Sequence, residues 1–436
     1  MESERRQTQT GGRDAVMGFI EGDVALSVGM PKSLPPKGFR WRLLSDLARL
    51  ESGHTPSRKV SEYWDNGDVP WITVKHAAAH HGQTLYETEE YITELGELNS
   101  SARLLPANTV CLTRTGSLGF VVVTGIPMCT SQGLVNWVCG PEIDYRYLKY
   151  VLLAESGSFH RFSWGSAHQT IYFPEVKAFH ALLPSLTEQS AIADVLGALD
   201  DKIESNRRVT ATIEKLVPLI FQSMTSESEL KPLPEVAKLQ KGISYRSVDL
   251  EDSETAMVTL KSYDRNGGYK SNGLKPYIGK YKPEQVLLPG DMAVAQTDLT
   301  QGAEVVGRVI RIPRQEDFET LVASLDLVIV RPLDAADKNY LYGALLQEDF
   351  REHCRSRTSG TTVLHLGSDA IPKYSIPWAE GDVRKVFSDE VQPLLEEHDS
   401  LTKESTSLKR LWDALLPELL SGRLRVKDAE SMMENM

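Results

Sequence analysis

Residues 44–53 read Leu-Ser-Asp-Leu-Ala-Arg-Leu-Glu-Ser-Gly, and residues 233–242 read Leu-Pro-Glu-Val-Ala-Lys-Leu-Gln-Lys-Gly. The two stretches share their apolar spacing and their final glycine. Three looser matches follow in the same order along the chain, pairing 105–115 with 288–298, Tyr147-Leu148 with Tyr340-Leu341, and Leu183-Pro184 with Ile376-Pro377. Ordered repetition of this kind predicts a structural unit that occurs twice.

Each copy has the pattern of a mixed α/β domain. Short β-branched runs predict strands, and apolar residues at helical spacing predict a helix late in each copy. The strands are expected at 120–124, 134–138, 304–312 and 325–330, and the helices at 147–153 and 340–346. Turn signals rich in Asn, Gly and Pro separate these pieces.

After each copy the apolar period changes to alternating steps of four and three residues. This heptad pattern predicts two long helices, over 188–217 and from Val391 onward, that pack on each other as an antiparallel coiled-coil-like pair. The alternative is that each helix packs only on its own domain. The expected interface comprises Leu196, Leu199, Ile203, Asn206, Ile213, Leu394, Leu401, Leu408, Trp412 and Leu415.

Polar residues also lie in these seams. Asn206, Thr210, His398 and Ser405 are expected to fix the register or to meet one another. Pro218 and Pro417 are expected to kink the two helices. At 1.5 Å per residue, the first helix would act as a ruler of about 45 Å between the two domains.

The predicted fold is therefore α+β, with two repeated mixed α/β domains separated by two long antiparallel coiled-coil-like helices. The expected boundaries are a partly flexible leader over 1–38, domain 1 over 39–184, a central helix over 185–229, domain 2 over 230–377, a C-terminal helix over 378–427 and a flexible tail over 428–436.

Composition excludes several classes of protein. Of the 436 residues, 41% are hydrophobic and 25% charged, values typical of a folded globular chain and not of a disordered, collagen-like or membrane protein. Glu21 and Asp23 interrupt the apolar run from Ala15 to Met30, so we expect a cytoplasmic protein without a signal peptide.

Charge at first argues against a nucleic-acid partner, since the net charge is −12. However, residues 185–229 hold eight acidic against four basic side chains, and residues 378–436 hold thirteen against eight. Nine of the twelve excess negative charges thus lie in the helical segments. The two domains are nearly neutral, and either could carry a basic face.

Familiar catalytic motifs are absent from the sequence. It contains no phosphate-binding G-x-x-x-x-G-K-[ST], no H-E-x-x-H, no G-x-S-x-G and no dinucleotide-binding G-x-G-x-x-G. The four cysteines form no C-x-x-C pair, which argues against a thiolate zinc site or a disulfide framework. We expect a non-catalytic chain that binds no cofactor or metal itself. A hidden site made of scattered carboxylates is the alternative.

Two equivalent polar turns are the main candidates for reading DNA. The first follows a strand and contains Arg114, Thr115 and Ser117, where arginine can make the bidentate contact to guanine. The second contains Gln296, Thr297, Asp298 and Thr300, whose amides and hydroxyls suit adenine or mixed base edges. The alternative is a structural turn capped by Thr and Asp.

Three further groups add candidates for contacts to bases or phosphates. A second pair of polar turns contains Ser166, His168 and Gln169 in one copy and Arg357, Thr361 and Thr362 in the other. A pair of strand ends contributes Thr73, Lys75 and His76, matched by Lys261 and Tyr263. Lys270 and Lys275 belong to the segment 269–282, which has four lysines and three tyrosines and could equally be a solvated hairpin.

With these residues in view, the chain resembles the specificity subunits of type I restriction–modification systems. The opening Ser-Gly-His-Thr-Pro-Ser-Arg of 52–58, with Tyr63-Trp64 and 69–72, is similar to the start of a target-recognition domain in that family. The segment 183–207 is similar to the family's central conserved helix, and 297–301, 304–307 and 415–423 also match its pattern. The resemblance covers about residues 39–427.

The resemblance implies a DNA-reading subunit whose two target-recognition domains each read half of a bipartite site. It implies partners as well: double-stranded DNA and two methyltransferase subunits, docked on the helices, that supply S-adenosylmethionine chemistry. It leaves open whether ATP-dependent motor and nuclease subunits join, or whether the system is one of modification or phage defence without a motor. The rival hypotheses are a single-chain DNA-modifying enzyme and a coiled-coil scaffold that binds protein.

Overall fold

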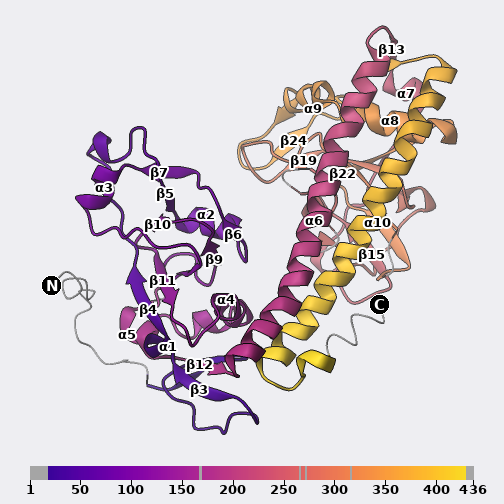
Figure 1. Cartoon of the computed structure of the whole chain (residues 1–436). Helices are drawn as coiled ribbons and strands as arrows, with labels where there is room; N and C mark the ends of the chain where they lie inside the picture. The colour runs from indigo at the N-terminus through magenta and orange to yellow at the C-terminus, as the bar shows by residue number, and fades with distance from the viewer. Residues whose placement is uncertain (1–17, 166–168, 265–266, 271–272, 315–316, 429–436) are drawn as a thin grey trace. The chain divides into compact units, whose positions relative to one another are not determined.

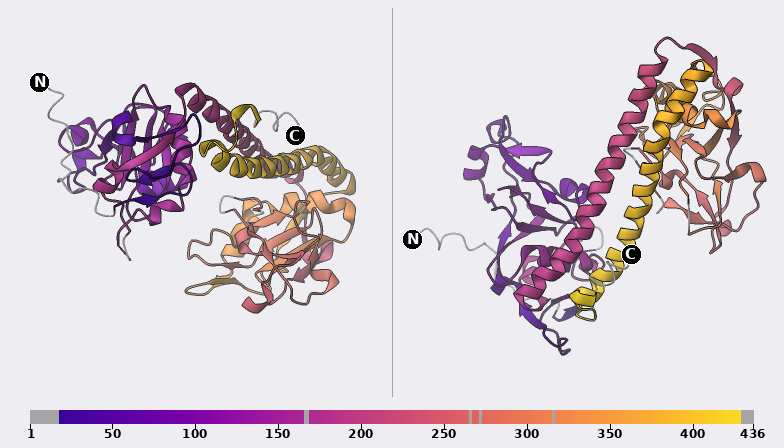
Figure 2. Two further views of the ribbon diagram at one scale, coloured as in Figure 1. Left: turned by 90° about the horizontal axis from the view of Figure 1, so that it is seen from below. Right: turned by 45° about the vertical axis from the view of Figure 1, so that its right-hand side comes forward.

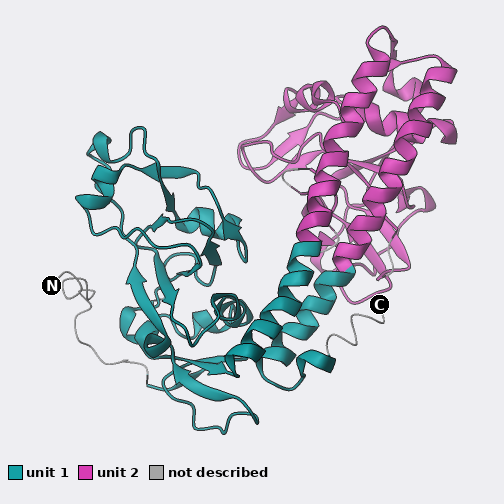
Figure 3. Ribbon diagram, in the orientation of Figure 1, with its two compact units in different colours: residues 1–202, 407–436 teal, residues 203–406 magenta. Residues whose placement is uncertain are grey.

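The computed structural model describes residues 18–165, 169–264, 267–270, 273–314 and 317–428. The chain forms two compact units, residues 1–202 with 407–436 (unit 1) and residues 203–406 (unit 2), coloured separately in Figure 3. Two long helices, α6 (Leu186–Thr225) and α10 (Gly381–Leu420), each contribute a segment to both units. No helix among the described residues is long and apolar enough to cross a membrane.

Unit 1 is built on a five-stranded sheet. Its strands, in spatial order, are β4 (Ala48–Ser52), β11 (Leu134–Cys139), β8 (Thr109–Thr113), β9 (Val121–Thr124) and β6 (Thr84–Leu85). A three-stranded sheet contains β10 (Cys129–Thr130), β5 (Val69–Ile72) and β7 (Glu90–Ile92), and a four-stranded sheet contains β1 (Ile20–Glu21), β2 (Leu26–Val28), β12 (Phe179–Leu183) and β3 (Arg40–Leu43). The helices are α1 (Leu44–Leu47), α2 (Val74–Ala79), α3 (Glu94–Leu98), α4 (Tyr145–Ala154) and α5 (Phe173–Lys177).

Unit 2 repeats this plan. Its main sheet has the order β14 (Ala237–Lys241), β22 (Leu327–Pro332), β18 (Met292–Ala295) and β20 (Val309–Arg311). Three smaller sheets contain β16 (Lys275–Pro276), β15 (Thr255–Val258), β21 (Thr320–Ala323) and β17 (Val286–Leu287); β13 (Glu229–Pro232) and β25 (Ser375–Trp378); and β19 (Thr297–Asp298), β24 (Leu364–Leu366) and β23 (Thr358–Ser359). The helices are α7 (Leu233–Val236), α8 (Lys338–Leu345) and α9 (Glu348–Arg355).

The order of strands confirms the predicted duplication. The series β4-β11-β8-β9 and β14-β22-β18-β20 arise in the same order along the chain and occupy the same places in their sheets. The repeated glycine has a physical cause. A Cβ on Gly53 would lie 1.9 Å from the carbonyl oxygen of Ser131, and a Cβ on Gly242 would lie 2.0 Å from that of Ser324. Only glycine allows this close approach of two chain segments, once in each unit.

Helices α6 and α10 run antiparallel. In unit 2, Asn206 bonds to Glu404, Glu214 to His398, and the ring of Phe221 contacts that of Phe387, so that residue numbers rise on one helix as they fall on the other. The two helices lie side by side in Figures 1 and 2. The predicted pairing is confirmed.

The apolar seam packs on the partner helix and also on the adjacent domain, so the alternative that each helix packs only on its own domain is wrong. In unit 1, Leu196, Leu199, Trp412 and Leu415 belong to one core, with Leu408 packed against it. In unit 2, Ile213 belongs to a core against which Leu394 packs. Asn206 is buried, while Ile203 and Leu401 are half-buried.

In the described part of the chain, Asn206 and His398 of the seam pair with carboxylates and not with each other. Asn206 Nδ2 donates to Glu404 Oε2 at 2.7 Å, and His398 Nε2 lies 3.3 Å from Glu214 Oε1. Each thus pairs with a carboxylate beside the seam of the opposite helix. Helix α6 continues through Pro218 to Thr225, within the range 185–229 expected for the central helix, and the expected kink at Pro218 stays a prediction.

Part of the predicted leader belongs to the sheet of unit 1. Strand β2 pairs antiparallel with β12, and the buried carboxylate of Glu155 accepts hydrogen bonds from the backbone N–H groups of Asp23, Val24, Ala25 and Leu26. Ser158 Oγ donates to the same carboxylate at 2.5 Å. The leader residues 1–14 and most of the tail, both expected to be flexible, lie outside the described residues.

The strand predicted over 304–312 is shorter in the structure. Only Val309–Arg311 form β20, and residues 304–307 turn away because the carboxylate of Asp298 accepts from the N–H groups of Val305 and Val306. A β-branched run alone did not reveal this side-chain anchor.

Candidate nucleic-acid interface

In unit 1 the structure brings two of the predicted polar turns together. Backbone bonds join Ile171 N–H to Arg114 C=O at 2.8 Å and Gly116 N–H to Gln169 C=O at 3.2 Å. The hydroxyls of Thr115 and Thr170 are 2.8 Å apart. The segments 114–117 and 169–171, far apart in sequence, therefore form one small surface.

Unit 2 assembles the equivalent turns in the same way. Leu366 N–H donates to Gln296 C=O at 2.8 Å, as Ile171 does to Arg114. Thr297 faces His365 across β19 and β24, in the place of the bridge between Thr115 and Thr170. The recurrence of this arrangement identifies the two turns as one structural feature built twice.

Each turn is also fixed to the main sheet by the same bond. Arg114 N–H donates to Gly133 C=O, and Gln296 N–H donates to Asp326 C=O, both at 2.8 Å. The structure therefore makes Arg114 and Gln296 equivalent, one residue away from the sequence repeat, which pairs Arg114 with Thr297. The two turns correspond as predicted, but the register within them differs by one residue.

A threonine followed by a lysine is the second shared feature. Thr73 caps α2 by accepting from His76 N–H, and Thr259 caps the 3-10 helix η4 (Leu260–Ser262) by accepting from Lys261 N–H. Lys75 and Lys261 each come two residues after the cap, and both are exposed. Their ammonium groups are available to phosphates, although Lys75 Nζ also lies 3.4 Å from Glu89.

In unit 1 the capped helix adjoins the polar turn. A Cβ on Gly133 would lie 2.3 Å from a methyl carbon of Val74 and 3.6 Å from that of Thr115. The helix α2 and the turn at 114–117 therefore meet around Gly133, and they form one continuous candidate surface.

Arg114 is half-buried at this surface. Its guanidinium carbon lies 4.8 Å from the centre of the Phe173 ring, and NH1 reaches the carbonyl of Ile171 at 3.5 Å. Burial lowers the pKa of Arg114, and its Nε atom is buried without a hydrogen-bond partner among the described residues. Ser117, beside it, is exposed.

In unit 2 the polar side chains of the equivalent turn are used internally. The amide of Gln296 donates to the carbonyl of Leu325, and Thr297 Oγ1 donates to Asp326 Oδ1 at 2.8 Å. The Asp298 carboxylate accepts from Thr300 N–H, Thr300 Oγ1, and the N–H groups of Val305 and Val306. These bonds lower the pKa of Asp298 despite the opposing effect of its burial.

Several predicted contact residues are core residues instead. Tyr263 is 4% exposed and its hydroxyl donates to Ala293 C=O at 2.8 Å, while His76 is 4% exposed and packs against the ring of His80. Thr297 and Asp298 are also buried. The sequence shows these polar residues next to exposed ones, but which side of the backbone faces the interior depends on the tertiary fold.

Other predicted residues lie at the surface. Arg357, Thr361 and Thr362 are exposed beside the turn of unit 2, where Gln301 Nε2 donates to Thr361 C=O at 2.6 Å. Lys270 Nζ lies 2.7 Å from Asp264 Oδ2, and Lys275 Nζ lies 5.7 Å from the ring centre of Tyr245. Gln169 Oε1 lies 2.7 Å from His160 Nδ1, and Ser166 and His168 lie outside the described residues.

Sequence reasoning missed three residues at these turns. Thr170 and His365 are equivalent partners on the adjoining strand, and Leu299, at the tip of the unit 2 turn, is 68% exposed. Continuing the repeat comparison past residue 169 would have paired Thr170 with Val363, so spacing alone did not indicate His365. The sequence around Leu299 did not indicate that this leucine would be exposed at the turn.

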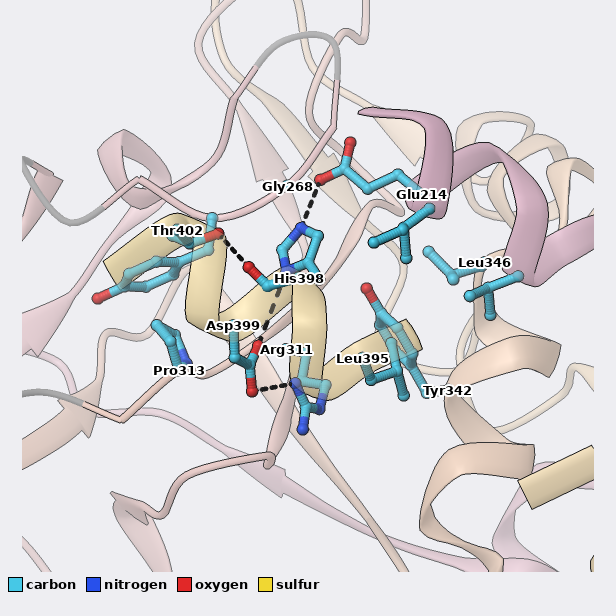
Figure 4. Close-up of a pocket in the computed structure, with 13 residues that line it drawn as sticks. Glu214, Gly268, Arg311, Pro313, Tyr342, Leu346, Leu395, His398, Asp399 and Thr402 are labelled. Atoms are coloured by element: carbon cyan, nitrogen blue, oxygen red, sulfur yellow. Dashed lines mark hydrogen bonds and ion pairs between the residues drawn. The ribbon is translucent and has the colours of Figure 1, made fainter. Parts of the chain in front are cut away.

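A pocket in unit 2 lies where α6, α10 and the sheet meet (Figure 4). His398 lies between Glu214 and Asp399, and Arg311 NH1 donates to Asp399 Oδ2 at 2.6 Å. Each charge therefore has an opposite neighbour. No cluster of three or more His, Cys, Asp or Glu side chains that could hold a metal occurs in the described parts of the chain.

Known proteins are similar to this chain in sequence and in fold. The family model described as "Type I restriction modification DNA specificity domain" matches residues 36–215. The specificity subunit of the type I restriction enzyme MjaIX from Methanocaldococcus jannaschii is 27% identical over 426 residues, which cover 90% of this chain and 95% of that protein. The chain is similar over most of its length to a specificity subunit of the type I restriction–modification systems, and residues 36–215 match the DNA specificity domain of that family.

Two further comparisons agree with this family. The EcoR124I/EcoR124II specificity subunit from Escherichia coli is 27% identical over 195 residues, covering 43% of this chain and 44% of that protein. The crystal structure of a type I system S subunit from M. genitalium matches with a TM-score of 0.57 at 16% identity, covering 89% of this chain and 97% of that one. The structural match supports the predicted fold of two α/β domains with paired helices.

Proposed function

We propose that this chain is the DNA sequence-specificity subunit of a type I restriction–modification complex, and that each domain reads one half of a bipartite site. One observation carries the proposal. The same pair of polar turns is built twice on the same sheet frame, but it presents different side chains in the two units. Repetition of the frame suits one kind of ligand, and the different side chains suit two different half-sites.

The chemistry of each surface suits a distinct task in this proposal. Arg114, which carries a fork of N–H donors, would contact guanine in the major groove. Lys75 and Lys261, at equivalent exposed positions, would contact phosphates and so position each domain without reading sequence. Nine of the twelve excess negative charges lie in the segments 185–229 and 378–436, away from these residues in sequence.

The proposed protein partners are two methyltransferase subunits docked on the helices. One flank of α6 in unit 2 presents Val209, Leu216 and Leu219, which are 42%, 39% and 59% exposed. Apolar side chains spaced along a helix in this way suit a protein partner. S-adenosylmethionine, and ATP if a motor takes part, would be bound by partner subunits in the cytoplasm, and this chain would itself catalyse no reaction.

Mapping methylated bases in the genome, with and without this gene, tests the reading function. We expect a bipartite motif whose methylation disappears when the gene is deleted. An unchanged methylation pattern, or methyl transfer by the purified chain alone, would contradict the proposal.

Leu216→Glu tests the docking surface. Placing a charge on the apolar flank should weaken capture of the methyltransferase by at least tenfold, since an ionised carboxylate is costly to bury. The matched control is Leu230→Glu, because Leu230 is 63% exposed and lies on β13, outside the helix. Equal capture by the wild type and Leu216→Glu would place the docking surface elsewhere.

A further inference from the structure

The turn 296–300 of unit 2 exposes an apolar side chain, where polar side chains that contact bases are expected. Gln296, Thr297 and Asp298 direct their side chains to partners within the unit. The amide nitrogen of Gln296, the hydroxyl of Thr297 and the carboxylate of Asp298 are therefore already engaged within the unit. Leu299, which follows them directly, is 68% exposed.

The backbone around Leu299 is held on both sides. The carboxylate of Asp298 accepts from Thr300 N–H at 2.8 Å and from Val305 N–H at 2.6 Å, so one buried side chain fixes both ends of the loop. Arg355 NH2 donates to Gly302 C=O at 3.2 Å and holds the middle. The leucine is thus presented by a preorganised turn, and little conformational entropy would be lost when it makes a contact.

Positive charge lies beside this tip. Arg355 and Arg357 are exposed, and both have backbone carbonyls as partners, which leaves their charge uncompensated by those bonds. Guanidinium groups in this position suit phosphates on either side of a groove. Arg355 holds the loop that carries Leu299, so a phosphate bound by this arginine would bring the leucine close to the groove.

We infer that Leu299 is a specificity-determining residue that contacts the C5-methyl group of a thymine in the half-site read by unit 2. The inference rests on the proposed function. In the major groove the thymine methyl is the apolar group on the edges of the bases, so it is the natural complement of an exposed leucine. The equivalent turn of unit 1 presents Gly116 and Ser117 instead, and it should lack this preference.

The test uses the complex with its methyltransferase partner and a duplex that carries the mapped site. Each thymine of the two half-sites is replaced in turn by deoxyuridine, which removes only the methyl group. For the wild type, we expect binding to weaken about fourfold at one or two positions of a single half-site, the effect of losing one buried methyl contact. Leu299→Ala should bind the thymine and deoxyuridine duplexes equally.

Leu333→Ala is the matched control, since Leu333 is 65% exposed in the same unit. Leu333 follows the end of β22, whereas the turn of Gln296 is bonded to Asp326, which precedes the beginning of that strand. It should keep the wild-type preference for thymine. If deoxyuridine has no effect at any position, or the same effect in Leu299→Ala as in the wild type, the inference is overturned. A wild-type complex that does not prefer the mapped site over unrelated DNA would instead refute the proposed function.

Discussion

Single residues at the proposed interface divide into those that would read bases and those that would hold phosphates. Arg114→Ala should relax recognition at one position of one half-site by about 1–3 kcal/mol, because a bidentate contact to guanine is lost. Lys75→Ala should weaken binding to every sequence and reduce the slope of log affinity against log salt by about one. Competition binding with systematically altered sites at several salt concentrations separates the two. Uniform weakening by Arg114→Ala would show that it contacts a phosphate.

Glu155 illustrates a residue whose role is to hold the chain together. Replacing it with alanine would leave the N–H groups of residues 23–26 without their carboxylate acceptor in a buried position. We expect a loss of about 2–4 kcal/mol in the free energy of unfolding of unit 1, given the cost of buried unpaired polar groups.

Urea unfolding followed by tryptophan fluorescence measures this loss. Glu155→Gln, which keeps one carbonyl oxygen as an acceptor, should be intermediate. A variant Glu155→Ala as stable as the wild type would mean that residues 22–28 contribute little to the unit.

At this scale the sequence predicted residue equivalence better than residue exposure. The repeat correctly pairs the turn of Arg114 with the turn of Gln296, although one residue out of register, and it correctly matches Lys75 with Lys261. It placed Tyr263 and Asp298 among the contact residues, although one is a core aromatic and the other an internal acceptor. Which face of a turn is solvated depends on partners such as Ala293 and Val305, which only the fold brings near.

At the scale of elements, the pair formed by α6 and α10 contains a charged cluster that makes stability depend on pH. Burial alone would lower the pKa of His398, but Asp399 and Glu214 outweigh it and raise the pKa to about 9. The ordinary value is 6.5, so the charged histidine stabilises the folded state fully below about pH 6.5, and this contribution is lost as the pH rises through about 9.

The facing groups include Arg311, at the end of β20, and Tyr342, from α8. Arg311 lowers the pKa of Asp399, and burial raises that of Tyr342. Between pH 7 and pH 9.5, the wild type should lose up to about 3 kcal/mol of stability in unit 2. His398→Asn should lose much less, as measured by unfolding midpoints at the two pH values. The same loss in both proteins would assign the pH dependence to another group.

The heptad spacing predicted both helices and their pairing, because an apolar stripe requires a partner surface. It could not predict which polar groups meet across the seam. Glu404 and Glu214, the partners of Asn206 and His398, lie beside the stripe, where spacing alone does not distinguish a solvated carboxylate from a paired one.

For the whole molecule, the ruler hypothesis remains a prediction. Inserting one heptad after Lys202 in α6 and another after Thr406 in α10 would lengthen each helix by about 10 Å while keeping the apolar stripe in phase. The spacer between the two half-sites should then grow by about three base pairs, at 3.4 Å per base pair along each strand. Methylation mapping of cells that carry the variant measures the spacer, and an unchanged spacer would contradict the hypothesis.

Gly53 and Gly242 have a consequence for how such a gene can evolve. Both allow the same close approach of two chain segments, so the two units have the same backbone arrangement at these equivalent positions. We expect recombination at these equivalent positions to move the polar turns of one unit onto the matching sheet of the other. New target sequences could then arise by recombination of existing domains, without further substitutions to restore the packing of the core.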